Sequence, residues 1–352
     1  MRFVFWLSSA LVLSAAALPL LEEQDAEEVN VIPLRVTRTK TPAGVSAKHY
    51  QHPWYEFLSV GLFIGSNLQD FWYEFSTITS DIVINFCPEN GPSDPKKCFE
   101  PRNSSSYKII DDNVASDQIA FKAYWKQSEF PRHPAKMEQN GMTGVFGAGW
   151  PSLSRWNIPS FWLKALGNEE KKMFGIFMSH DGLTRFLRVG GELNSTECDL
   201  STIQWHDLSS PKYWQIPIDG FKYGNIEKQQ RKEAVIDTGS GWLGVPGTYL
   251  LDMMNRNNVT FDRTTGAYTV DCRRSLALPI LELTIGQKNH KIFPSAYVDR
   301  QNPLDNGNCV VNLKNSRSLV GSDWVLGLPF LQSFCTSYDF DNKRLGIADN
   351  MF

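Results

Sequence analysis

The chain has 352 residues, of which 21% are charged, and its formal net charge at pH 7 is −3. This length suffices for two folded units with real cores, and no basic excess exists to attract phosphate backbones or anionic lipid. We therefore expect no nucleic-acid partner.

The first 17 residues have the features of a secretory signal peptide. Arg2 provides the positive end, residues 3–13 are mostly apolar, and Ser-Ala-Ala-Ala follows at residues 14–17. An uncleaved membrane anchor is the alternative, but the apolar run is short and acidic residues follow it directly. We expect cleavage near Ala17 and secretion to the extracellular space, without a membrane partner; a lysosomal or other secretory-pathway compartment is the alternative location.

Cysteines and sequons agree with this compartment. Six cysteines without a Cys-x-x-Cys pair favour three disulfides over a metal site. The sequons at Asn103, Asn194 and Asn258 predict glycosylated surface loops. His49 and His52 have the spacing of a metal-ligand pair but lie in a segment without helical periodicity, so we expect no metal and no cofactor.

Along the chain, residues 18–52 form a mixed segment in which nothing predicts packed structure. Short apolar and aromatic runs then alternate with Gly, Pro, Asn and Ser, as at residues 57–64, 71–75 and 81–86. This pattern is typical of strands and turns and predicts a mainly β protein. Helices are expected only in a few stretches, such as residues 159–166 and 248–255.

A faint internal repeat divides the chain into two halves. Residues 75–79, Phe-Ser-Thr-Ile-Thr, correspond to residues 236–240, Ile-Asp-Thr-Gly-Ser. An apolar pair followed by glycine also occurs in each half, at residues 145–147 and 325–327. Two related β lobes that face each other would explain both repeats.

The loop at residues 237–240, Asp-Thr-Gly-Ser, resembles the active-site loop of pepsin-like aspartic peptidases. Further family landmarks follow in order from residue 54 nearly to the C-terminus, and they include residues 99–107, 144–147, 213–216, 294–297, 324–327, 338–339 and 344–348. The resemblance implies a mainly β, bilobal pepsin-like fold with two lobes around a central cleft. Its parts would be a leader or remnant prosegment at 18–52, an N-terminal lobe at 53–192 and a C-terminal lobe at 193–352.

The resemblance also implies the disulfide pairing. Cys87 would pair with Cys98, and Cys272 with Cys309. Cys198 and Cys335 stand where secreted nematode members of the family carry an extra pair, so we expect them to be joined as well.

In this family each lobe contributes one aspartate, and the two carboxyl groups share a proton while they activate a water molecule. The second aspartate is present as Asp237, but Ser76 occupies the place of the first, and a hydroxyl has no useful acid or base near neutral pH. Thr77 and Thr238 are the threonines that lock the two loops together in the family. Ile78 replaces a loop glycine and is expected to alter the shape of the first loop.

Two further features bear on catalysis. Glu74 lies two residues before Ser76 and points to the same face of the strand, but its backbone position is ~6.6 Å from that of Ser76. We therefore do not expect Glu74, or Asp81, to replace the missing carboxylate. Residues 107–143 are shorter than in active members and lack the Tyr-Gly signature of the flap, the hairpin that encloses substrate.

We therefore predict a secreted, monomeric, catalytically inactive family member that binds a peptide or protein in or around the cleft. The alternative is an aspartic-type acid endopeptidase with weak or unusual proteolytic activity that uses Asp237.

Overall fold

The structure is a computed structural model that describes residues 31–40, 54–87, 98–121, 124–132, 144–316 and 322–351. The predicted signal peptide, His49 and His52 lie outside these residues. The described part is mainly β, as the sequence predicted, and its strands form four sheets. No helix within it is long and apolar enough to cross a membrane.

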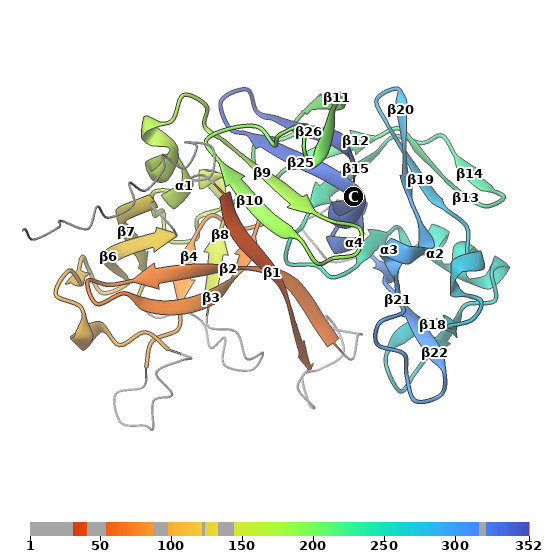
Figure 1. Ribbon diagram of the computed structural model, residues 1–352, viewed down its shortest axis with the longest axis horizontal. Coiled ribbons are helices and arrows are strands. Elements are labelled where there is room, and N and C mark those ends of the chain that lie inside the picture. The colour runs from red at the N-terminus through yellow and green to blue at the C-terminus, as the bar shows by residue number, and fades with distance from the viewer. Residues whose placement is uncertain are drawn as a thin grey trace, which may run out of the picture.

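One large, mostly antiparallel sheet takes strands from both halves of the chain (Figure 1). Its main path has the spatial order β11 (Cys198–Asp207), β26 (Arg344–Asn350), β25 (Phe334–Asp339), β9 (Met173–Met178), β10 (Arg185–Val189), β1 (Val31–Lys40), β2 (Trp54–Ile64), β3 (Gln69–Ser76), β8 (Gly144–Gly147) and β4 (Ile82–Ile84). Off this path, β2 also pairs with β6 (Val114–Phe121), which pairs with β5 (Lys108–Ile109) and β7 (Tyr124–Pro131).

The other three sheets belong to the second half of the chain. The first contains β12 (Gln215–Ile218), β15 (Lys232–Ile236), β24 (Trp324–Leu326), β16 (Leu243–Val245) and β23 (Leu313–Asn315). The second contains β14 (Ile226–Lys228), β13 (Gly220–Tyr223), β19 (Leu281–Ile285) and β20 (Lys288–Ile292). The third contains β17 (Thr260–Asp262), β18 (Ala267–Asp271), β22 (Asn308–Val311) and β21 (Val298–Asp299).

The helices are short. They are α1 (Phe161–Ala165), α2 (Gly247–Arg256), α3 (Pro294–Tyr297) and α4 (Leu328–Ser333), with 3₁₀ turns η2 (Pro101–Asn103), η4 (Pro151–Leu153), η5 (Leu166–Asn168) and η6 (Ser275–Ala277). The two helical stretches predicted from apolar periodicity are confirmed as α1 and α2.

The internal repeat is confirmed by strand pairing. In the first half, β3 pairs in parallel with β8, which pairs antiparallel with β4. In the second half, β15 pairs in parallel with β24, which pairs antiparallel with β16. Each half therefore builds the same three-stranded unit around its own apolar-apolar-Gly strand.

The glycine that ends this motif is required for packing in both halves. A methyl group on Gly147 would stand 2.5 Å from the Ser80 backbone carbon, and one on Gly327 would stand 2.3 Å from the Ser240 carbonyl oxygen. Because both neighbours are backbone atoms, neither can move aside easily, and only glycine fits. The repeat in the sequence thus reflects the same close backbone approach in each lobe.

Strand β1 corrects one expectation. The sequence predicted no packed structure in residues 18–52, yet residues 31–33 pair with β10 and residues 34–40 pair with β2. Ile32 and Leu34 lie on the buried face of this strand, at 3% and 6% exposure. The alternation is too short to stand out in the sequence, and its partner β10 lies about 150 residues away, so local pattern could not predict the pairing.

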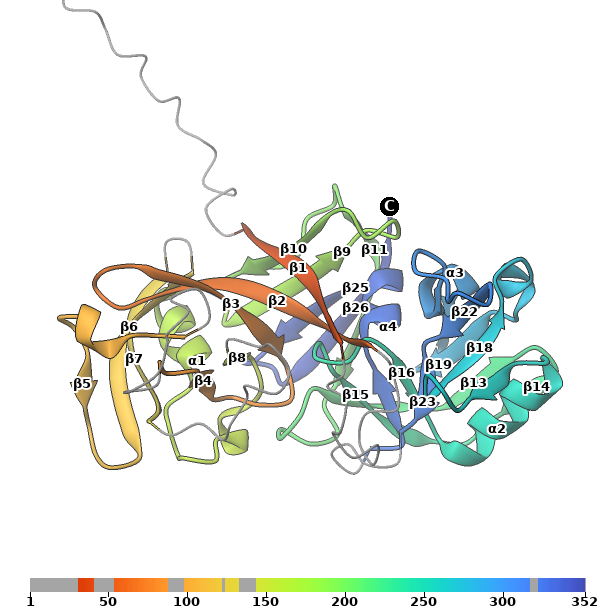
Figure 2. The same ribbon diagram turned by 90° about the horizontal axis from the view of Figure 1, so that it is seen from below.

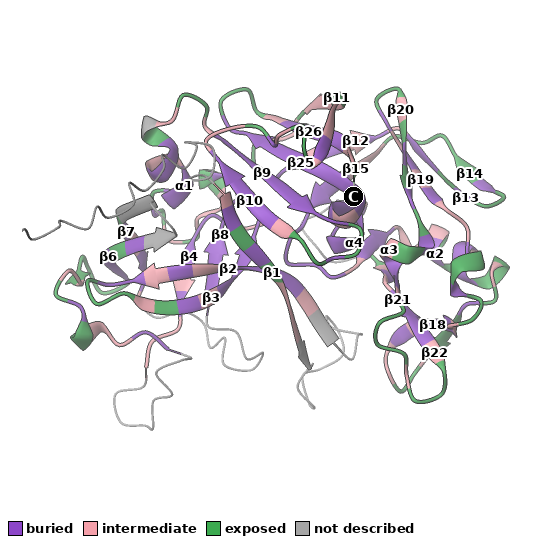
Figure 3. Ribbon diagram, viewed as in Figure 1, coloured by how far each residue is buried: buried purple, intermediate pink, exposed green. Residues whose placement is uncertain are grey.

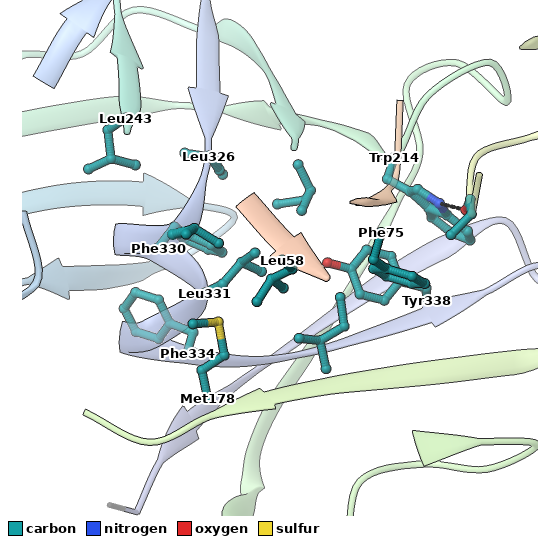
Figure 4. Close-up of a cluster of buried hydrophobic side chains, with 14 of the residues drawn as sticks. Leu58, Phe75, Met178, Trp214, Leu243, Leu326, Phe330, Leu331, Phe334 and Tyr338 are labelled. Carbon is teal, nitrogen blue, oxygen red and sulfur yellow. Dashed lines mark hydrogen bonds between the residues drawn. The ribbon is translucent and has the colours of Figure 1, made fainter. Parts of the chain in front are cut away.

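A shared aromatic core joins the two halves. The Trp214 Nε1 group donates a hydrogen bond to the Ala148 carbonyl oxygen at 3.0 Å (Figure 4), and the rings of Phe174 and Tyr338 stack with centroids 4.4 Å apart. Figure 3 shows the middle strands of the large sheet, such as β9 and β25, buried while the outer turns are exposed. The interface between the halves is therefore a continuous core, which fixes their two loops relative to each other.

Candidate active site

Ser76 and Asp237 occupy equivalent positions in the repeated unit. Phe75 pairs with Phe146 in the first half, and Ile236 pairs with Leu326 in the second, so the residue that follows each is Ser76 or Asp237. Both side chains are buried, at 2% and 4% exposure. Each stands where a central strand turns into its loop.

The two loops are joined by hydrogen bonds between Thr77 and Thr238. The Thr77 hydroxyl donates to the Ile236 carbonyl at 2.8 Å and accepts from the Thr238 amide at 3.2 Å. In mirror fashion, the Thr238 hydroxyl donates to the Phe75 carbonyl and accepts from the Thr77 amide at 3.1 Å. All four residues are buried, so these bonds hold Ser76 and Asp237 at one place between the halves.

The Asp237 carboxyl group is buried but has a local partner. Its Oδ1 accepts a hydrogen bond from the Gly239 amide at 2.9 Å. Burial raises the pKa of Asp237 to about 6, and the bond from Gly239 opposes part of this rise. Asp237 therefore both caps its own turn and can exchange a proton in mildly acidic solution.

A second carboxyl group enters the site from the first half. A methyl group built on Gly239 would stand 2.4 Å from Glu74 Oε1 and 3.2 Å from Asp237 Oδ1. The Glu74 and Asp237 oxygens are therefore less than about 6 Å apart, a range in which carboxyl groups influence each other's ionisation. Glu74 is 7% exposed. The Glu74 carboxyl group therefore lies beside the Asp237 loop, and whether it replaces the missing carboxylate is a question for experiment.

Asp81, the other carboxylate considered from the sequence, has a structural role. Its Oδ2 accepts a hydrogen bond from the Arg155 amide at 2.9 Å, and its carbonyl accepts one from Gly147 at 3.1 Å. It is 1% exposed and holds the first loop against the following segment.

Comparison with known protein families identifies the family of the chain. A sequence profile described as eukaryotic aspartyl protease matches residues 109–350. The chain belongs to this family. The match begins after Ser76, so the equivalence of Ser76 with Asp237 depends on the repeated strand pairing and not on the profile.

Curated relatives include nematode and vertebrate proteins. Aspartic protease 17 and Aspartic protease 1 of Caenorhabditis elegans are each 29% identical, over 59% and 58% of this chain and 54% and 53% of their own lengths. Embryonic pepsinogen of Gallus gallus is 24% identical over 81% of this chain and 78% of its own length. With the nematode proteins, the similarity thus spans about half the length of the relatives.

In the first half, β6 and β7 form a hairpin, and β5 pairs with the outer edge of β6. In Figure 2, β5, β6 and β7 lie at the end of the molecule remote from the second half, and no described residue of this hairpin is hydrogen-bonded to the Asp237 loop. Ile78 is only partly buried at the tip of the first loop. That the first half lacks a flap over Ser76 and Asp237 stays a prediction.

An ionic cluster that the sequence did not predict lies beside the second loop. Arg38 of β1 contacts Glu56 of β2 at 3.0 Å and also pairs with Asp299 of β21. Burial raises the pKa of Glu56, with Arg38 opposing the rise and Asp299 adding to it. A methyl group on Gly241 would stand 2.7 Å from Glu56 Cβ, so the cluster packs directly on the Asp237 loop.

The remaining predicted sites lie away from the two loops. The three disulfides implied by the resemblance are confirmed as Cys87–Cys98, Cys198–Cys335 and Cys272–Cys309. Asn103 and Asn258 are exposed, while Asn194 is partly buried and its Oδ1 accepts hydrogen bonds from Thr196. Glycosylation of the three sequons stays a prediction.

Proposed function

We propose that this family member does not hydrolyse peptides and instead binds a peptide or protein in or around the cleft between its lobes. The observation that carries the proposal is Ser76 at the position equivalent to Asp237, held by an intact pair of threonines. A serine hydroxyl cannot share a proton with Asp237 near neutral pH, so the paired acid and base of the family are not formed by these two residues.

The retained scaffold supports a binding role. The Thr77–Thr238 bonds and the shared core preserve the arrangement of the lobes, and the three disulfides each stabilise one lobe, although Ser76 lacks a carboxyl group. A cavity of about 370 Å³ also lies beside the ionic cluster, and its lining includes Glu56, Arg185 and Asp299. Its charged walls suit a polar peptide more than an apolar small molecule.

We also propose that the protein is a monomer that acts after passage through the secretory pathway. The signal-peptide features, the disulfides and the three sequons support this location. Extracellular secretion is the expected destination, and a lysosomal compartment is the alternative.

The test is a cleavage assay with a mixed peptide library between about pH 3 and pH 7, the range in which paired carboxyl groups work. The disulfide-bonded wild type, Asp237→Ala and Ser76→Asp are compared, each with and without pepstatin. We expect no cleavage by the wild type. Cleavage that pepstatin blocks and Asp237→Ala abolishes would contradict the proposal. Enrichment of library peptides on the immobilised wild-type protein tests the binding role directly.

Glu74 favours a second candidate function, an acid endopeptidase with weak activity. In that mechanism one carboxylate of the Glu74–Asp237 pair takes a proton from water as the water oxygen bonds to the peptide carbonyl carbon. The protonated partner donates its proton to the carbonyl oxygen, which gives a gem-diol intermediate. The proton taken from water then passes to the amide nitrogen, the C–N bond breaks to release the amine, and one hydroxyl proton returns to the partner carboxylate, which leaves a carboxylic acid product.

Glu74→Gln separates the two candidates. It removes the first-half acid while it keeps the shape of the side chain and leaves Ser76 in place. Wild-type cleavage that disappears in Glu74→Gln would establish the endopeptidase. If the wild type does not cleave, Glu74 is not a catalytic acid towards these peptides.

A further inference from the structure

A second cavity lies wholly within the second half of the chain. It is bounded by α2, by the hairpin of β17 and β18, and by the segment of β22 and β23. Figure 1 shows α2, β18 and β22 at the right of the molecule. The volume of the cavity is about 460 Å³, within the range of about 300–1,000 Å³ in which proteins hold small molecules. Ser76, Glu74 and Asp237 do not line it.

The walls of this cavity are mostly apolar. They include the side chains of Leu250, Leu251, Phe261, Tyr268, Val311 and Leu313. Leu251 and Phe261 are 57% and 44% exposed, so two large apolar side chains at the cavity are left open to water. Covering such surface with an apolar chain is favourable, because it removes the surface from water.

One charged side chain, Lys314, lines the cavity. Its ammonium group lies 5.2 Å from the ring centroid of Trp242, and no carboxylate of the described residues pairs with it. Burial lowers the pKa of Lys314 to about 8, without a neighbouring acid to oppose the change. A partly buried cation without an anion is costly, and a bound anion would offset that cost.

We propose that this cavity binds an aliphatic monocarboxylate, such as a fatty acid, with the carboxylate on Lys314 and the chain along the apolar walls. The charge of Lys314 selects an anion over a cation, and the single cation among apolar walls selects one carboxylate over a polyanion. A neutral alcohol of the same length would keep the chain contacts and lose the ion pair. The residues of this site are not those of the proposed peptide-binding cleft, so the test of fatty-acid binding is independent of the test of the proposed function.

The experiment is calorimetric titration of the whole disulfide-bonded protein with decanoate, decanol and decylamine, all below their aggregation concentrations. The variants are Lys314→Met, which keeps the apolar stem, and Lys291→Met, an exposed lysine of β20 as the matched control. We expect one saturable decanoate site that is weakened about tenfold or more in Lys314→Met and unchanged in Lys291→Met. Decanol should bind at least about tenfold more weakly than decanoate, and decylamine should not bind.

Two further measurements test the proposal if Lys314→Met does not fold. Leu251→Ser, at an exposed position, should weaken decanoate severalfold while leaving the protein folded. Wild-type affinity should also fall as pH rises through about 8, because Lys314 loses its charge. Tyr268, the other titratable residue of the lining, does not titrate there, since burial raises its pKa further above 10. Absence of saturable decanoate binding, or equal affinity for decanoate and decanol, overturns the proposal.

Discussion

Replacing Asp237 with asparagine should stabilise the protein at neutral pH but not in acid. The pKa of Asp237 is raised from 3.8 to about 6 because its carboxyl group is buried. A raised acid pKa means that the folded state holds the proton more tightly than the unfolded state does. Wild-type stability attributable to this group is therefore highest below pH 3.8 and falls as pH rises towards and above 6.

The size of this effect follows from the shift. About two pKa units correspond to about 3 kcal/mol, the maximum that ionisation of Asp237 subtracts from the free energy of unfolding. Asparagine is neutral at every pH, and its side-chain oxygen can still accept the hydrogen bond from the Gly239 amide. The stability of Asp237→Asn relative to wild type should thus rise by about 1 to 3 kcal/mol between pH 3.5 and pH 7.5.

Urea unfolding at a series of pH values, with disulfides intact, measures this difference, and Asp305→Asn at an exposed turn is the control. A difference between Asp237→Asn and wild type that does not change with pH would refute the argument that burial sets this pKa. If Glu74→Gln moves the midpoint of the Asp237-dependent change, the two carboxyl groups titrate as a coupled pair.

Two other predictions concern how the halves are held together. Thr238→Val leaves the Thr77 amide and the Phe75 carbonyl without their hydrogen-bond partner, so the free energy of unfolding should fall by about 2 to 4 kcal/mol, whereas Thr184→Val at an exposed position should change it by less than about 0.5 kcal/mol. A loss as small as that of the control would show that the threonine bonds do not stabilise the junction. Arg38→Met leaves Glu56 and Asp299 without their shared cation and should cost about 2 kcal/mol at pH 7, and less at pH 4 where Glu56 takes up a proton. Equal losses at both pH values, measured by urea unfolding, would argue against the ionic explanation.

The sequence by itself determined the features that local pattern encodes. Strand and turn texture predicted the β class, apolar periodicity predicted α1 and α2, and the repeated Val-Phe-Gly and Val-Leu-Gly segments predicted two related units. The resemblance to pepsin-like peptidases supplied the disulfide pairing and the prediction that Ser76 stands in the place of an aspartate. Each of these depends on residues close in sequence or on a motif with fixed spacing.

Only the tertiary structure decided which distant side chains meet. It paired β1 with β10, placed the Glu74 carboxyl group against Gly239, and brought Arg38 to Asp299. The cavity at Lys314 likewise forms only when α2 packs beside β18 and β22. These contacts join residues up to about 260 positions apart, and such contacts depend on how the two halves pack and not on local propensity.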